Sequence, residues 1–234
     1  MNKYFFRLFI HLITYWSILI GQKIVNMNGT YDLDGDNMLE FVALELNPNK
    51  DIFPKLVRHY EVDADGYQTI MWEFIPPVAL EGDFVDAKVG DVNGDGVPEL
   101  VVVMNLTRFG DNNSPHVFIA TYDWDGTHFS EIPSASLDIG KENKSLRCNN
   151  FQLLDQDADG KQEIVLSLGS PFRGFAIVGS SPSGLSIVKK IRPDQLLVGS
   201  GLLYVAALDY DYDGYEDVVA FSPDGKILKA QPFY

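Results

Sequence analysis

The sequence predicts an all-β protein made of four repeats. After residue 21, short apolar or alternating runs are separated by Gly, Asp, Asn and Pro, and no long segment shows helical periodicity. An acidic nonapeptide begins at residues 32, 91, 155 and 209, and each copy runs directly into an apolar segment typical of a buried strand. Successive copies start 59, 64 and 54 residues apart, which indicates one structural unit repeated along the chain.

The nonapeptide is clearest in its second copy, residues 91–99 (DVNGDGVPE). Oxygen-bearing side chains fall at its first, third, fifth and ninth positions, and alternate oxygens on a tight turn can converge on one point. Hard cations such as Ca²⁺ bind about six to eight oxygen atoms at short range. Gly94 and Gly96 permit the positive φ angles that a loop around a small ion needs, and the sixth position is Gly in three copies and Asn37 in the first. The candidate side-chain ligands are Asp32, Asp34, Asp36 and Glu40; Asp91, Asn93, Asp95 and Glu99; Asp155, Asp157, Asp159 and Glu163; and Asp209, Asp211, Asp213 and Asp217.

The net charge of −15 argues against a nucleic-acid partner, because phosphate binding requires basic surfaces. The four loops explain much of this charge, since they carry 4, 3, 4 and 4 carboxylates at the four positions, 15 in all. Up to four bound Ca²⁺ ions would bring the net charge to −7. Two plainer interpretations stay open. The loops could be soluble turns, because Asp, Asn and Gly favour turns in any case, or the ions could serve folding alone.

The first 21 residues predict an export signal. Lys3 and Arg7 give a positive start, an apolar run covers residues 8–20, and Gly21 is a small residue at a possible cleavage point. The alternative is an uncleaved membrane anchor, and the predicted location is secreted, periplasmic or cell surface. With Cys148 as the single cysteine, no intrachain disulfide can form, so bound metal would have to stabilise an exported fold.

Residues 22–234 divide into repeats of approximately 22–83, 84–140, 141–195 and 196–234. The second repeat predicts four strands, at 84–89, 100–104, 116–122 and 128–132. The first predicts strands near 22–25 and at 41–46, 56–62 and 68–74, and the third at 151–154, 164–168, 175–178 and 185–191. Four antiparallel strands per repeat of this length are typical of one blade of a β-propeller.

The last repeat predicts three strands, 202–208, 218–221 and 226–232, so its blade is thin or incomplete. Because an open sheet edge invites association, three arrangements stay open. They are a four-bladed ring with one thin blade, part of a larger ring, and a partial ring completed by a partner subunit.

The repeated pattern Asp-x-(Asp/Asn)-x-Asp-Gly-x-x-(Asp/Glu), followed by an apolar strand, resembles the FG-GAP/VCBS repeats, and the likeness extends from about residue 22 to the end. Those repeats form the calcium-binding blades of integrin α-subunit head domains and of many secreted bacterial proteins. The resemblance implies a β-propeller whose acidic loop joins the first two strands of each blade. It also implies that Ca²⁺ is bound by the four side-chain positions together with a main-chain carbonyl at the seventh position, which is occupied by Met38, Val97, Lys161 and Tyr215.

An EF-hand also begins Asp-x-Asp-x-Asp-Gly, but it requires a Glu at position 12 and flanking helices. The residues at that position are Ala43, Val102, Leu166 and Ala220, none of which can bind the ion. The sequence also lacks the motifs Gly-x-Ser-x-Gly and His-Glu-x-x-His and any phosphate-binding loop.

The predicted function is therefore a non-catalytic binding, adhesion or assembly module whose partner is a protein or a glycan. Tyr210, Tyr212 and Tyr215 crowd the fourth loop and form a candidate ligand patch. Two alternatives stay open: a carbohydrate-active hydrolase or lyase on the same scaffold, and a structural subunit completed by a partner.

Overall fold

A computed structural model describes residues 24–47, 55–75, 81–107, 116–131, 133–139, 146–169, 172–192, 204–210, 212, 217–221 and 227–231. In these ranges the protein is all-β, with fifteen strands and no helix, which confirms the predicted class. Accordingly, this part of the chain contains no helix long and apolar enough to cross a membrane. The predicted export signal lies outside the described residues, as do Asp211, Asp213 and Tyr215.

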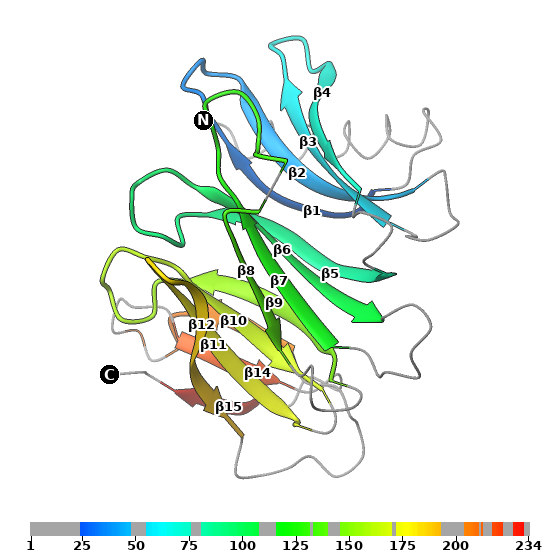
Figure 1. Cartoon of the computed structure of the whole chain (residues 1–234). Helices are drawn as coiled ribbons and strands as arrows, with labels where there is room; N and C mark the ends of the chain where they lie inside the picture. The colour runs from blue at the N-terminus through cyan, green and yellow to red at the C-terminus, as the bar shows by residue number, and fades with distance from the viewer. Residues whose placement is uncertain are drawn as a thin grey trace.

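The strands form four antiparallel sheets, each an up-and-down meander in chain order (Figure 1). The first sheet contains β1 (Ile24–Tyr31), β2 (Leu39–Leu46), β3 (Lys55–Val62) and β4 (Gln68–Phe74). The second contains β5 (Glu81–Gly90), β6 (Glu99–Thr107), β7 (His116–Tyr122) and β8 (Ala135–Ile139). The third contains β9 (Cys148–Leu154), β10 (Glu163–Leu168), β11 (Gly174–Ser181) and β12 (Gly184–Ile191). The fourth contains β13 (Tyr204–Leu208), β14 (Asp217–Phe221) and β15 (Ile227–Gln231).

The sheets pack face to face in chain order, and one apolar cluster fills each interface. Val42 and Trp72 of the first sheet meet Tyr122 of the second. Further clusters join the second sheet to the third, and the third to the fourth. The strand β6 reads as a continuous apolar run because both of its faces are buried, with Val102 in the first interface and Val101 in the next.

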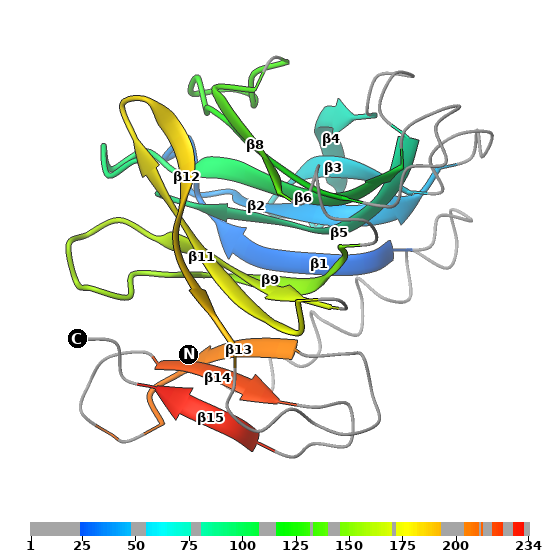
Figure 2. The same cartoon turned by 60° about the horizontal axis from the view of Figure 1, so that its bottom comes forward.

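The first strands of the sheets form a row along one side of the stack. Contacts join β1 to β5, β5 to β9, and β9 to β13, and Figure 2 shows this row with β4, β8 and β12 at the opposite edges of their sheets. Two asparagine side chains join sheets near this row. Asn105 donates to the carbonyl oxygen of Cys148 at 2.9 Å and accepts from its amide nitrogen at 2.8 Å. Asn150 makes the same pair of bonds to Val205, at 2.7 and 3.0 Å.

The strand predicted at 128–132 is wrong, because the fourth strand of the second sheet is β8 (Ala135–Ile139). Residues 123–131 form a longer turn instead. The carboxylate of Asp125 accepts hydrogen bonds from the main-chain nitrogens of Thr127 and His128, both at 2.9 Å. Trp124 forms an isolated bridge with Phe129, whose side chain is fully buried in the first interface. The apolar residues in this segment therefore fill the core as part of a turn.

Candidate metal centre

Each acidic nonapeptide lies in the hairpin between the first and second strands of its sheet. The first three hairpins project from the same side of the stack, at the left of Figure 1. In each of these three, the fourth and sixth positions both have positive φ. These pairs are Gly35 (79°) and Asn37 (68°), Gly94 (83°) and Gly96 (85°), and Ala158 (57°) and Gly160 (90°). Tyr212 holds the fourth position of the last hairpin at 64°. Two residues with positive φ, separated by one other residue, give the hairpins their common tight curve.

Three of the hairpins bring their carboxylates together. In each group, one oxygen from every member lies within 4.8 Å of the others. The groups are Asp32, Asp34, Asp36 and Glu40 in the first hairpin, Asp91, Asp95 and Glu99 in the second, and Asp155, Asp157 and Glu163 in the third. Because like charges at this separation repel, the arrangement fits a cation at the centre of each group.

Two predicted ligands are placed differently from the rest. The amide nitrogen of Asn93 donates to Asp95 at 3.2 Å and to Glu99 at 2.5 Å, so this side chain lies among the carboxylates as a neutral donor. Asp159 is outside the third group. Its carboxylate accepts from the main-chain nitrogen of Lys161 at 2.8 Å and lies 3.9 Å from the ammonium of the same residue.

The first and seventh positions are fixed by main-chain hydrogen bonds. The carboxylate of Asp91 accepts from the nitrogens of Gly94 and Gly96, at 2.6 and 2.9 Å. The seventh-position nitrogens of Met38 and Val97 donate to the fifth-position carboxylates, at 2.6 and 2.8 Å, as Lys161 does in the third hairpin. These bonds orient the acidic side chains through the backbone of their own loop.

The carboxylate at the ninth position accepts a hydrogen bond from the main-chain nitrogen at the second position in all four hairpins. The pairs are Leu33 with Glu40 (2.9 Å), Val92 with Glu99 (2.9 Å), Gln156 with Glu163 (3.0 Å) and Tyr210 with Asp217 (3.0 Å). Three of these acids, Glu40, Glu99 and Asp217, are at most 5% exposed. The ninth position therefore closes the hairpin as well as supplying charge, a role that sequence reasoning missed.

Burial changes the pKa of three ninth-position acids, Glu40, Glu99 and Glu163. Burial, together with the nearby charges of Asp95 and Asp91, raises the pKa of Glu99 to about 7. Burial also raises the pKa of Glu40 and of Glu163. A bound cation favours the charged carboxylate and would oppose both effects, so protons and metal compete for the same groups.

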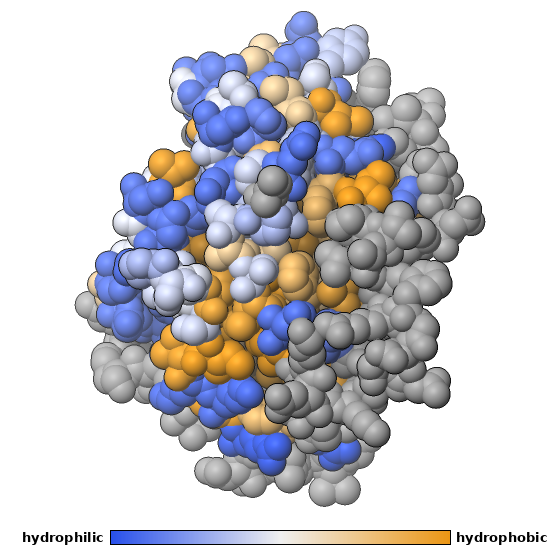
Figure 3. All heavy atoms as spheres, viewed as in Figure 1, coloured by the Kyte–Doolittle hydropathy of each residue, from blue (hydrophilic) through white to orange (hydrophobic). Residues whose placement is uncertain are grey.

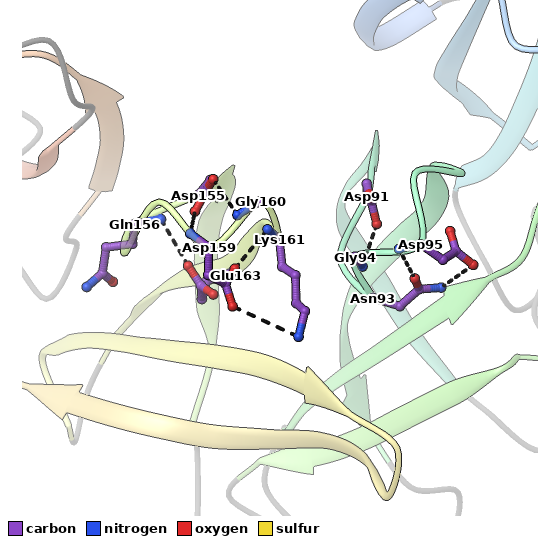
Figure 4. Close-up of polar contacts among 10 residues, drawn as sticks. All are labelled: Asp91, Asn93, Gly94, Asp95, Asp155, Gln156, Asp159, Gly160, Lys161 and Glu163. Atoms are coloured by element: carbon purple, nitrogen blue, oxygen red, sulfur yellow. Dashed lines mark hydrogen bonds and ion pairs between the residues drawn. The ribbon is translucent and has the colours of Figure 1, made fainter.

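The second and third hairpins contact each other directly, and Figure 4 shows them side by side. The main-chain nitrogen of Gln162 donates to the carbonyl oxygen of Asp91 at 2.8 Å. The aliphatic chain of Lys161 lies so close to Gly94 that a Cβ there would come within 2.6 Å of it. A cavity of about 180 Å³ adjoins the third hairpin, between the ligand positions Asp157 and Glu163 and the side chains of β11 and β12.

Other predicted features lie apart from the acidic groups. Tyr210 and Tyr212 are exposed, at 48% and 90%, as expected of a surface patch. His116 pairs with Asp138 at 3.1 Å, and Cys148 is buried. Within the described part of the chain, the three acidic groups contain no histidine or cysteine.

No protein-family model matches the sequence, and no curated protein matches it. Among solved structures, the chain is similar to the crystal structure of rhamnogalacturonan lyase YesW, with 15% sequence identity and a TM-score of 0.49. The match covers 89% of this chain and 42% of the lyase chain, so this chain spans less than half the length of the lyase chain.

Proposed function

We propose that this protein is a calcium-binding β-propeller module that binds a protein or glycan partner without catalysing a reaction. The observation that carries the proposal is the repetition of one acidic group in the same hairpin of three successive sheets. A catalytic centre occurs once in a chain, whereas ions that stabilise a repeat occur once per repeat.

The ligand chemistry favours Ca²⁺ over the transition metals. All members of the three groups offer carboxylate oxygens, which suit hard cations, and no thiolate or imidazole takes part among the described residues. Asp32, Asp34 and Asp36 are exposed, so their side of the first group is open to water ligands. Flexible loops with many oxygens suit the large, adaptable coordination shell of Ca²⁺ better than the rigid octahedron of Mg²⁺.

The packing of the sheets supports a propeller. Consecutive sheets stack face to face and present their first strands as a row, which is how blades lie around a central axis. The exposed aromatic rings of Tyr210 and Tyr212 support a partner site at the fourth hairpin, because exposed aromatics are enriched where proteins bind their ligands.

Calcium titration of the protein by isothermal calorimetry, after chelator treatment, tests this function. We expect Asp95→Ala to lose one bound ion from the stoichiometry of the unaltered protein. The matched control is Asp63→Ala, which removes an acidic turn residue that accepts from Asp65 and Tyr67 but lies outside the three groups. The control should keep every ion. Equal stoichiometry for the two variants, or no heat of binding at all, would refute the proposal.

A further inference from the structure

A histidine without hydrogen-bond partners lies buried between the first two sheets. His59 of β3 is 1% exposed. Its ring stands edge to face with Trp124 and Phe129, at centroid distances of 5.2 and 5.4 Å. Neither Nδ1 nor Nε2 of this ring has a hydrogen-bond partner, and neither does Nε1 of Trp124. Three ring nitrogens, contributed by β3 and by the turn that follows β7, are therefore buried without an evident partner.

Such atoms demand an explanation, since more than nine in ten buried polar groups in proteins are hydrogen-bonded. A neutral imidazole has one donor and one acceptor, and an indole has one donor. The near-perpendicular rings allow one N–H to point at the face of the other ring, at an interplanar angle of 86°. That contact can satisfy a single nitrogen, so the other two still need a partner.

The surroundings define what that partner must be. Burial lowers the pKa of His59 to about 4, so its ring is neutral at physiological pH and one nitrogen accepts. A cation is disfavoured because the indole nitrogen of Trp124 can only donate. An anion is disfavoured by the negative charge of Asp34, which acts on His59 from the first hairpin. A small neutral molecule that both donates and accepts meets these requirements.

We propose that an ordered water molecule occupies the interface between the first and second sheets and bridges His59 and Trp124. The water accepts from Nε1 of Trp124 and donates to the unprotonated nitrogen of His59. This internal hydration site is independent of metal binding, and it ties the turn around Asp125 to the first sheet through a polar contact inside an otherwise apolar cluster.

Oxygen-17 magnetic relaxation dispersion, which counts long-lived internal waters in solution, tests the proposal. We expect His59→Phe and Trp124→Phe each to lose the same single water. Trp72→Phe is the matched control, because it truncates an indole of the same cluster whose nitrogen is not among the unpartnered atoms. It should leave the count unchanged. An unchanged count in either test variant would overturn the proposal.

Thermal unfolding gives a second, independent measurement. If the water satisfies both rings, each single variant leaves the other ring unpaired and lowers Tm by about 2–8 °C. The double variant should then lose less than the sum of the two. A rise in Tm for His59→Phe would show that the nitrogens have no partner in the native protein, and would refute the site. Should the variants not fold, a high-resolution crystal structure decides, by the presence or absence of an ordered solvent peak between the two rings.

Discussion

Ala158 and Tyr212 occupy the fourth position of their hairpins at φ of 57° and 64°, where the first two hairpins have glycine. A left-handed conformation costs an L-residue roughly 1–2 kcal/mol, and glycine adopts it freely. The sequence indicated positive φ only at glycine and at Asn37, because alanine and tyrosine do not favour this conformation. It also gave no sign of the bond from the second-position nitrogen to the ninth-position carboxylate, since every residue except proline has a main-chain N–H.

Replacing Ala158 with glycine should therefore raise the free energy of unfolding by about 0.5–1 kcal/mol, because relief of strain exceeds the added entropy of the unfolded chain. Urea unfolding at a fixed calcium concentration measures the change. Ala176→Gly is the control, because Ala176 is buried in β11 and the substitution there should destabilise. A loss of stability for Ala158→Gly would contradict the positive φ at this position.

The pH dependence of the metal-free protein should report Glu99. Its pKa of about 7 in the folded protein lies above the ordinary value of 4.5, so between these two pH values the folded state holds a proton that the unfolded state has released. This contribution to stability is complete below pH 4.5 and is lost as the pH rises through 7. Calcium affinity should change in the opposite direction and increase with pH, because the ion requires the charged carboxylate.

Thermal unfolding in EDTA and calcium titrations between about pH 5 and 8 measure the two trends. Glu99→Gln serves as the control, since it keeps the shape of the side chain and should flatten both dependences. If the unaltered protein and Glu99→Gln show the same pH dependence of Tm and of calcium affinity, groups other than Glu99 are responsible for the titration.

Most predicted strands match the structure in position, because continuous or alternating apolar runs mark them in the sequence. The strand at 128–132 failed because Phe129 is apolar in a turn, where it fills the core without belonging to the sheet. The links made by Asn105 and Asn150 had no sequence signal either, since an asparagine that bonds main chain resembles one on the surface.

The outer strands β4 and β12 both carry an irregularity in their pairing. In β12 the register shift leaves Val188 as an extra residue, and in β4 a similar shift leaves Met71. Figure 3 shows an apolar area over β11 and β12, and Val188 of β12 is 68% exposed. Bulges twist an exposed edge away from the flat geometry that a further strand would need.

Substitution of Asn150 should weaken the junction between the third and fourth sheets. Asn150→Ala removes the side-chain acceptor of the Val205 amide. It also removes the shorter of the two side-chain bonds to the Val205 carbonyl oxygen, the other being from Gln152 at 3.5 Å, at a cost of about 1–3 kcal/mol in the free energy of unfolding. Asn150→Asp is a matched variant of the same shape. It keeps the acceptor for the amide of Val205 but places a second oxygen against the carbonyl. Guanidinium unfolding measures both variants, and an unchanged midpoint for Asn150→Ala would show that the two bonds add nothing to stability.

At the scale of the whole molecule, four antiparallel sheets follow from the repeat, and the structure contains them in chain order. The number of sheets could be predicted from the number of repeats, because each repeat contains the apolar residues that one sheet needs for its faces. Which face meets which neighbour could not be predicted, since Val101 and Val102 look alike in sequence and lie in different interfaces. The acidic hairpins project from one side of the stack, so charge is concentrated there.

Removal of metal should therefore lower Tm for the whole molecule. Each site filled at 100 times its dissociation constant adds about 2.7 kcal/mol to the free energy of unfolding. Differential scanning calorimetry in EDTA and in millimolar Ca²⁺ measures the shift. Potassium chloride at matched ionic strength is the control, because it screens the repulsion without filling the sites. An equal recovery of Tm in potassium chloride would mean that screening alone accounts for the effect.

The bond from Gln162 to Asp91 makes the third hairpin a reporter of the second. The amide hydrogen of Gln162 exchanges with solvent only when that bond opens. Its exchange rate should therefore follow the conformation of a loop in the neighbouring sheet. A spectroscopic probe placed on the third hairpin should therefore respond when the second hairpin changes conformation.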